Sequence, residues 1–260
     1  MQLKLSLGQI NVQLGAIEAN FDKVVELTKH AAAAGSKLIV FPELWSTAYS
    51  LEDWRKHACV MHEGIFDRVK TLAREQNIAI AGSLLERVDD CAYNTMTLHG
   101  ADGNLLGLYR KVHLVPMLDE PRWLAAGSSL SRVQCPWGTT GLGICYDLRF
   151  PEMWRSYALT GAKIVIISAE WPARRQQHWR TLLQARAIEN QMFVVACNRI
   201  GESKGELFAG NSMIISPWGE PLVEGSNDKE QLLTAEIEFD MVDEIRSNIP
   251  VFRDRRPDVY

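Results

Sequence analysis

The chain has 260 residues, of which 47% are hydrophobic and 23% charged, and its formal net charge is -4 at pH 7. This composition predicts a soluble globular protein with one large core. The nearly balanced charge offers no basic surface for nucleic acid or an anionic membrane, and no stretch approaches the roughly 20 apolar residues of a membrane span. We therefore expect a small-molecule partner, with no binding to nucleic acid or membrane.

The amino terminus and the cysteines favour a cytoplasmic location. Residues 1–6 lack the basic region and apolar stretch of a secretory signal. Five cysteines, an odd number without closely paired spacing, predict reduced thiols. The group His57-x-Cys59-x-x-His62 has ligand-like spacing, but it lacks a second ligand cluster and lies in a segment of helical composition. We expect neither a metal nor an organic cofactor.

The first part of the chain alternates between strand-like and helix-like patterns. Apolar residues recur at helical spacing in some segments and form short β-branched runs in others. In chain order we expect strands at 3–12, 37–41 and 78–82, and helices at 18–34 and 66–75. This βαβ order predicts parallel strand pairing.

The rest of the chain adds hairpins to this pattern. The runs at 94–99 and 105–109 flank Ala-Asp-Gly-Asn at 101–104, which is a hairpin signal and implies antiparallel pairing. A second hairpin is expected around 217–220. The remaining expected elements are helices at 151–160, 176–190 and 240–246, and strands at 163–168, 192–197, 212–215, 222–223 and 232–239.

About ten strands exceed what one strongly twisted sheet usually carries. The expected architecture is therefore a four-layer α-β-β-α sandwich, in which two mixed sheets pack together with helices outside. We expect a single domain over residues 1–248 and an extended tail over residues 249–260, which holds two prolines and three arginines. Such a tail either packs on a partner subunit or frays.

Three reactive or charged side chains, Glu43, Lys111 and Cys145, each come directly after an apolar run. If these strands are neighbours, their ends bring a carboxylate, an ammonium and a thiol into one crevice. An ammonium near a thiol favours the thiolate, and a partly desolvated carboxylate can take the thiol proton. Each residue type alone is more often structural. Together they predict a nucleophilic site.

The sequences around these residues resemble the three ordered signatures of the nitrilase superfamily of carbon-nitrogen hydrolases. Residues 178–191 and 217–219 also look similar to that family, so the resemblance covers nearly the whole chain. The form of the cysteine motif and the tail at 249–258 most resemble the branch that contains omega-amidase and the amidase of deaminated glutathione. The three signature segments are Phe41-Pro42-Glu43, Tyr109-Arg110-Lys111-Val112-His113-Leu114 and Gly143-Ile144-Cys145-Tyr146-Asp147-Leu148-Arg149-Phe150-Pro151-Glu152.

The resemblance implies a role for each of these residues. Cys145 would be the nucleophile and Glu43 the general base, while Lys111 and the backbone N–H of Tyr146 would hold the oxyanion. The implied reaction converts an amide of a small aliphatic substrate into a carboxylic acid and ammonia through a cysteine thioester.

The resemblance also implies a second glutamate and an oligomer. In that family a glutamate stands between the lysine and cysteine motifs, some residues before a glycine. Glu120 ahead of Gly127 matches this position, and Asp119 is the rival. The protein would be at least a homodimer, with the helix at 151–160 and the tail as contacts.

The substrate is less well defined by the sequence. An omega-amidase must bind a carboxylate at the far end of a short chain, and a guanidinium suits that task. Arg149, Arg174 and Arg175 are the candidates, but a structural pair with Asp147 or Glu152 explains Arg149 more readily.

Aromatic residues and one acidic residue are expected on the pocket walls. Glu170 stands where many relatives carry a neutral residue, and its charge would repel a dicarboxylic half-amide unless an arginine pairs with it. Half-amides of dicarboxylic acids are our first choice of substrate, and neutral aliphatic amides or a deaminated-glutathione type of substrate are the alternatives. The aromatic candidates are Trp45, Tyr49, Trp171 and Phe208.

Three other functions are open to this sequence. A cysteine-histidine hydrolase or acyltransferase would use His113 or His178 as its base, but would leave the glutamate and the lysine unexplained. A nucleotide-binding module would use the glycines at 138–143, whose spacing does not fit a dinucleotide fingerprint. A non-catalytic assembly protein could share the fold, although the complete set of four site residues argues against it.

Overall fold

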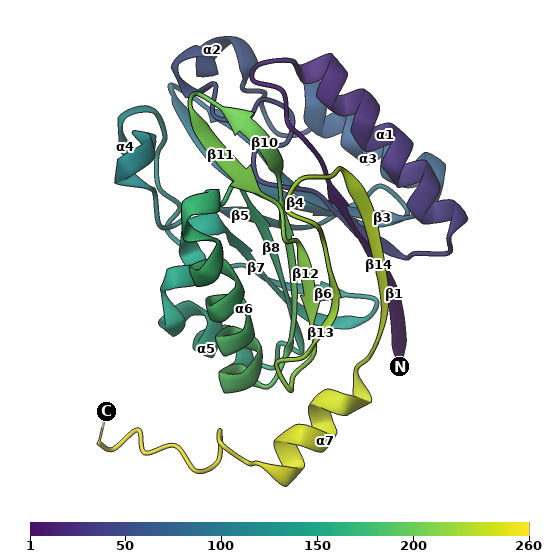
Figure 1. Ribbon diagram of the computed structural model, residues 1–260, viewed down its shortest axis with the longest axis vertical. Helices are drawn as coiled ribbons and strands as arrows, with labels where there is room; N and C mark the ends of the chain where they lie inside the picture. Colours follow the sequence, from purple (N-terminus) through teal and green to yellow (C-terminus); the bar gives the residue numbers. More distant parts are fainter. Residues whose placement is uncertain (260) are drawn as a thin grey trace.

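The computed structural model describes residues 1–259, and two six-stranded sheets face each other at its centre (Figure 1). The first sheet contains, in spatial order, β14 (Gln231–Glu238), β1 (Gln2–Gln9), β2 (Leu38–Val40), β3 (Ala79–Val88), β4 (Cys91–His99) and β5 (Leu105–Arg110). The second contains β13 (Pro221–Glu224), β12 (Met213–Ile215), β9 (Phe193–Asn198), β8 (Ile164–Ala169), β7 (Gly138–Ile144) and β6 (Arg132–Cys135).

Both sheets are mixed. In the first, β1, β2 and β3 are parallel and the other pairs are antiparallel. In the second, β7, β8 and β9 are parallel and are flanked by antiparallel strands. The parallel centres arise from the βαβ order of the sequence, and the antiparallel edges arise from its hairpins.

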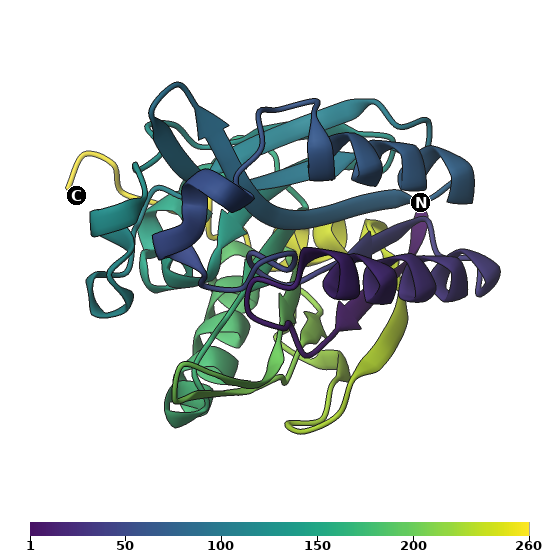
Figure 2. The same ribbon diagram turned by 90° about the horizontal axis from the view of Figure 1, so that it is seen from above.

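Helices cover the outer face of each sheet, as Figures 1 and 2 show together. On the first sheet they are α1 (Ile17–Ala33) and α3 (Gly64–Gln76), and on the second α5 (Pro151–Leu159) and α6 (Gln176–Asn190). The predicted four-layer α-β-β-α sandwich is therefore confirmed.

The sequence of strand β2 is continuously apolar because both of its faces are buried. Leu38 and Val40 belong to the core cluster that extends between the two sheets, whereas Ile39 belongs to the cluster under α1 and α3. A strand buried on both faces cannot alternate between polar and apolar residues. All three side chains are fully buried.

The glycines at 138–143 belong to β7, where two of them make room for α5. A Cβ atom on Gly143 would lie 2.4 Å from the Trp154 ring, and one on Gly141 would lie 2.7 Å from the Tyr157 ring. The run is thus a strand inside a sheet, and its glycines allow close packing of a helix.

Several short elements were not predicted from the sequence. The helix suggested by the composition of residues 54–69 is broken between α2 and α3, so His57, Cys59 and His62 do not share one helix face. None of the described helices is long and apolar enough to cross a membrane. The short elements are η1 (Leu51–Asp53), α2 (Trp54–His57), η2 (Pro116–Leu118), α4 (Glu120–Trp123), η3 (Cys145–Arg149), η4 (Ala173–Arg175), β10 (Ile200–Ser203) and β11 (Glu206–Ala209).

The chain ends with α7 (Asp240–Asn248) and a segment without helix or strand over 249–259. The start of this segment packs on its own subunit: the Phe252 ring lies 5.0 Å from the Arg246 guanidinium carbon. Tyr260, the last residue of the predicted tail, lies outside the described residues. The division into a domain and a tail stays a prediction.

Candidate active site

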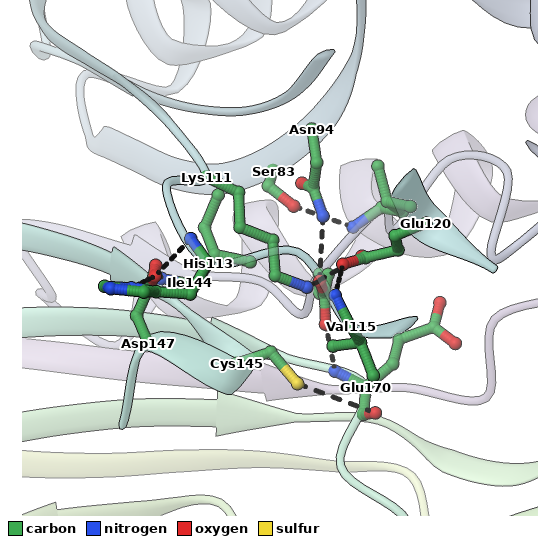
Figure 3. A network of polar contacts seen from close by, with 12 residues as sticks. Ser83, Asn94, Lys111, His113, Val115, Glu120, Ile144, Cys145, Asp147 and Glu170 are labelled. Carbon is green, nitrogen blue, oxygen red and sulfur yellow. Dashed lines mark hydrogen bonds and ion pairs between the residues drawn. The ribbon is translucent and has the colours of Figure 1, made fainter. Parts of the chain in front are cut away.

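Lys111 lies at the centre of a buried charge cluster (Figure 3). Its Nζ atom is 2.7 Å from Oε1 of Glu43 and 2.7 Å from Oε1 of Glu120, and all three side chains are fully buried. The structure thus brings together three residues singled out in the sequence. Glu120, rather than its neighbour Asp119, is the carboxylate that reaches the lysine.

Both sheets contribute to this cluster. Glu43 follows β2 and Lys111 follows β5, both in the first sheet, whereas Cys145 follows β7 in the second. The condition considered in the sequence, that these strands are neighbours, does not hold, because β3 and β4 separate β2 from β5 and β7 lies in the other sheet. The site instead forms where strand ends of the two facing sheets meet, and the Glu170 backbone N–H after β8 donates to Oε2 of Glu43 at 2.8 Å.

Two residues without a predicted catalytic role, Tyr49 and Asn94, complete the cluster. The Tyr49 hydroxyl lies 3.0 Å from Oε1 of Glu43 and 2.8 Å from Oε1 of Glu120, so it can donate to either. The Asn94 side chain donates from Nδ2 to Oε1 of Glu43 at 2.8 Å. Tyr49 was expected only as a pocket wall. Asn94 gave no sign in the sequence, because a single asparagine in a hairpin strand has no characteristic pattern.

The cluster determines the protonation of its members. Burial alone would lower the pKa of Lys111, but the carboxylates of Glu120 and Glu43 outweigh it and raise that pKa above its usual range. Burial raises the pKa of Glu120, against the opposing effect of Lys111. Lysine therefore stays an ammonium, held between two acidic groups.

Cys145 is a neutral thiol in this environment. Burial and then the Glu43 carboxylate raise the pKa of the thiol well above its usual value, and Lys111 only partly opposes them. Lys111 favours the thiolate, as expected, but burial and the carboxylates of Glu43 and Glu120 outweigh its effect on the pKa of Cys145. A proton must leave the thiol during attack, and Glu43 is the neighbouring carboxylate that can accept it.

The backbone holds Cys145 in a strained conformation at the end of β7. Its φ angle is 45°, in the left-handed region that non-glycine residues seldom adopt. The Asp147 carboxylate stabilises this turn by accepting a 2.8 Å hydrogen bond from the Ile144 N–H. Tyr146 is the second residue of η3, and the first N–H groups of a helix have no partner within it.

Asp147 also connects the turn to the lysine motif. Its carboxylate accepts a hydrogen bond from the Tyr109 hydroxyl at 2.8 Å and lies 2.7 Å from Nδ1 of His113, whose ring stacks on Phe150. His178 instead approaches Arg149, at 3.5 Å. Within residues 1–259, no histidine hydrogen-bonds the thiol, so the arrangement offers Glu43, and not histidine, as the base.

Two cavities adjoin the cluster. Only the smaller one, with a volume of about 30 Å³, touches Cys145; the larger has a volume of about 570 Å³. Met117, Leu118 and Glu170 line both cavities. The smaller is otherwise lined by Val115, Cys145, Tyr146, Arg149, Trp171, Pro172 and Arg175, and the larger by residues that include Tyr49, Asp119, Arg174 and Phe208.

A model of the carbon-nitrogen hydrolase family matches residues 4–247. The chain belongs to this family. The 2-oxoglutaramate amidase of Bacillus subtilis (strain 168) is 38% identical over 265 residues, which cover 100% of each chain. The omega-amidase NIT2 of Homo sapiens is 31% identical, covering 98% of this chain and 96% of that protein. These relatives confirm the resemblance to the nitrilase superfamily.

A solved structure agrees with this assignment. A CN-hydrolase superfamily protein from Xanthomonas campestris, which carries an arsenic adduct in its active site, superposes with a TM-score of 0.91 at 30% identity, covering 98% of each chain. The present carbon-nitrogen hydrolase is thus an enzyme that hydrolyses carbon-nitrogen amide bonds.

In this hydrolase two of the three candidate arginines, Arg149 and Arg175, line the same cavity as Cys145. Arg149 does not pair with Asp147 or Glu152 as the sequence suggested; its guanidinium carbon lies 4.6 Å from the Trp171 ring centroid. Arg175 reaches only the Met117 sulfur, at 3.4 Å. Neither has a carboxylate partner among the described residues.

The other expected substrate contacts have mixed outcomes. Arg174 pairs with Glu206 at 2.7 Å and lines the larger cavity. Trp171 lines the smaller cavity, and its indole N–H donates to the Arg175 carbonyl at 2.8 Å. Glu170 pairs with Arg199 at 3.1 Å, which supplies the arginine that the sequence argument required.

The prediction that Trp45 lines the pocket is wrong. Its side chain is 1% exposed and packs between Phe21 and Phe41 in the core beneath α1 and α3. The chain turns at Leu44, whose φ angle is 42°, so the residues after Glu43 return toward the core.

In the part of the chain that the structure describes, no group of three or more His, Cys, Asp or Glu side chains is placed to hold a metal ion.

Proposed function

We propose that this hydrolase is an omega-amidase, which removes the terminal amide of short dicarboxylic half-amides through a thioester at Cys145. The observation that carries the proposal is one cavity that holds both Cys145 and two guanidiniums, Arg149 and Arg175, without carboxylate partners. The names of the relatives, 2-oxoglutaramate amidase and omega-amidase, support the same substrate class.

The first half of the reaction forms the thioester. Sγ of Cys145 attacks the amide carbon while Glu43 takes the thiol proton, and the carbonyl electron pair moves to the oxygen. Lys111 and the N–H of Tyr146 stabilise this oxyanion; one such donor is typically worth about 3 kcal/mol of barrier. The tetrahedral adduct then collapses, the carbon-nitrogen bond breaks, and Glu43 gives its proton to the departing ammonia.

The second half regenerates the enzyme. Glu43 removes a proton from water as the water oxygen attacks the thioester carbon. The second tetrahedral adduct expels the Cys145 sulfur, which recovers its proton from Glu43, and a carboxylic acid leaves. Glu120 positions Lys111 in both halves, because the two share a 2.7 Å ion pair.

The two guanidiniums favour a substrate that carries a carboxylate. Burial and then the nearby Arg175 charge lower the pKa of Arg149. A bound carboxylate would relieve this repulsion and accept charge-assisted hydrogen bonds. A neutral amide would gain neither effect.

Ammonia release from matched substrates tests the proposal. Half-amides of dicarboxylic acids should be hydrolysed with higher kcat/KM than neutral amides or nitriles of equal length. Arg175→Gln should raise KM for half-amides about 10-fold to 100-fold, from the loss of about 1.5–3 kcal/mol per charged hydrogen bond, and should barely change KM for neutral amides. Preference of the native enzyme for neutral amides would overturn the omega-amidase assignment.

We also propose a homodimer in the cytoplasm. Two large apolar side chains, Ile188 on α6 and Trp218 in the turn before β13, are 54% and 49% exposed. They are adjacent, because Gln184 on α6 donates to the Gly219 carbonyl at 3.0 Å. All five cysteines are free thiols, which suits a reducing compartment.

A further inference from the structure

Glu170 has one carboxyl oxygen with a partner and one without. Oε2 accepts a 3.1 Å hydrogen bond from Nη1 of Arg199, whereas Oε1 is buried and has no partner in the described chain. Leaving a buried acceptor unsatisfied costs about 1–3 kcal/mol, and more for a charged group. Such an atom beside an active site calls for an explanation.

Arg199 cannot move to satisfy the free oxygen. It is fully buried, its Nε donates to the Ile200 carbonyl at 3.1 Å, and its Nη2 donates to the Val12 carbonyl at 2.5 Å. Its guanidinium carbon also lies 4.7 Å from the Phe208 ring centroid. The pairing with Oε2 is therefore fixed, and Oε1 remains available.

The position of Glu170 determines which part of a substrate it can meet. Its backbone contacts the reacting groups: the N–H donates to Glu43, and the carbonyl lies 3.8 Å from Sγ of Cys145. Its side chain extends away from the thiol (Figure 3), and Glu170 is among the residues that line both cavities. In a bound substrate, Oε1 would therefore lie nearer a group several bonds along the chain than the scissile amide.

The surrounding charges favour the acid form of Glu170. Three buried carboxyl groups, Glu43, Glu120 and Glu170, share two buried cations, Lys111 and Arg199. Burial raises the pKa of Glu170 to about 7, with Arg199 opposing the shift and Glu43 adding to it. The other charged or titratable groups that line the two cavities are Tyr49, Glu52, Asp119, Arg122, Cys145, Tyr146, Arg149, Arg174, Arg175, Lys204 and Glu206.

We propose that Glu170 is a specificity-determining residue whose protonated Oε1 donates a hydrogen bond to an acceptor oxygen on the substrate chain. The site would then prefer a half-amide that carries an oxo group over one with an unsubstituted chain. This inference rests on the proposed function, since it takes the distal carboxylate to lie at Arg149 and Arg175. Above the pKa of Glu170 the donor is lost, so binding of the oxo compound should weaken.

Binding to a Cys145→Ala background isolates this effect from chemistry. Because the thiol is neutral, the alanine leaves the charge of the site unchanged. The probes are three half-amides of equal length, namely glutaramate, 2-oxoglutaramate and L-glutamine, titrated by calorimetry from about pH 6 to about pH 8.5. Glu170→Gln keeps an acceptor for Arg199 and a permanent N–H donor, whereas Glu170→Leu has neither.

The expected result is a pattern across the three proteins. In the protein that keeps Glu170, 2-oxoglutaramate should bind about tenfold more tightly than glutaramate at the most acidic pH. This ratio corresponds to about 1.4 kcal/mol, the value of one hydrogen bond between uncharged groups. The advantage should fade at the most alkaline pH. Glu170→Gln should keep the advantage at every pH, and Glu170→Leu should lack it. Comparison with Glu170→Gln at each pH cancels any titration of the ligand itself.

Other outcomes overturn the inference. An equal affinity for the oxo and unsubstituted compounds, or an advantage that survives in Glu170→Leu, would remove the role of Glu170 while leaving the omega-amidase proposal intact. Loss of the advantage in Glu170→Gln, or tightest binding of L-glutamine, would make Glu170 an anionic acceptor instead of a donor. Failure of all three half-amides to bind would remove the proposed function and this inference with it.

Discussion

At the residue scale, the site consists of a neutral thiol beside the buried ammonium of Lys111 and two buried carboxyl groups, Glu43 and Glu120. Burial and the two carboxyl groups outweigh the effect of Lys111 on the pKa of the thiol, so the lysine does not create a thiolate in the resting enzyme. Its positive charge becomes useful when the substrate oxygen gains negative charge. The proposed mechanism makes Glu43 the proton acceptor, and two changes at single residues test this arrangement.

Glu43→Gln should lower kcat about 10²-fold to 10⁴-fold, the range typical of a lost general base. The glutamine can still accept a hydrogen bond from Lys111, so the cluster should remain folded. Steady-state ammonia release measures the effect. Asp119→Asn is the matched control, since Asp119 makes no contact with the lysine, and its kcat should stay within about twofold of the native value. A larger loss in the control would contradict the placement of Glu120.

Lys111→Met should destabilise the fold by about 3–5 kcal/mol at neutral pH, because it leaves two buried carboxylates without a cation. Burial already raises the pKa of Glu120 above its unfolded value. A carboxyl group with a raised pKa contributes stability below the pKa that it has in the unfolded chain, and this contribution is lost as the pH rises through the folded-state pKa. The loss of stability in Lys111→Met should therefore shrink toward about pH 5. Urea unfolding at both pH values measures it.

The exposed pair Lys204–Glu52 provides the control for this experiment. Lys204→Met removes an equivalent ion pair at the surface and should cost less than about 1 kcal/mol at either pH. A deficit in Lys111→Met that is equally small, or that grows in acid, would contradict the charge balance described for the cluster.

At the scale of elements, the site depends on how closely α5 packs on the strand that carries Cys145. Gly143 lies against Trp154, whose indole N–H in turn donates to the Asp147 carbonyl in the nucleophile turn at 3.1 Å. The glycine, the helix and the turn therefore form one unit. A change in the packing of α5 should reach the nucleophile through this contact.

Gly143→Ala should destabilise the fold by about 1–3 kcal/mol, because its Cβ would overlap the Trp154 ring. Combining it with Trp154→Phe should cost less than the sum of the two single changes, since the smaller ring frees the space. Thr139→Ala on the same strand serves as the control and should fall within about 0.5 kcal/mol of the native protein. Strict additivity in the double variant, measured by urea unfolding, would rule out this contact.

The sequence predicted most elements but not how they meet. Hydrophobic periodicity located α1 and α6 because each buries one face, and the motif residues Glu43, Lys111 and Cys145 were found from their place after apolar runs. Contacts between distant segments were not predictable in this way. Tyr49 and Asn94 reach the cluster, and Trp45 leaves it, because of turns and register that have no local signature.

At the scale of the whole molecule, the catalytic groups lie between two sheets that the chain builds one after the other. Almost all of the first sheet comes from residues before Cys145, and the second from those around and after it, while β14 returns to pair with β1. Glu43, Lys111, Glu120 and Cys145 therefore all come from one chain. Dimer formation would serve stability or substrate access instead of supplying a reacting group.

Ile188→Glu should convert the proposed dimer into a monomer, because it places a charge in an apolar contact. Sedimentation velocity at micromolar concentration measures the change in mass. Leu14→Glu, at an exposed apolar position before α1, is the control and should leave the dimer unchanged. A native protein that sediments as a monomer would remove the dimer proposal.

The proposed reaction passes through a thioester between Cys145 and the acyl part of a half-amide. The most direct measurement is intact mass analysis of the enzyme, quenched in acid within one turnover of a half-amide, followed by peptide mapping. We predict an added mass equal to the substrate less ammonia on the peptide that contains Cys145, and no adduct or turnover in Cys145→Ala. An adduct on any other residue, or undiminished ammonia release by Cys145→Ala, would contradict the account.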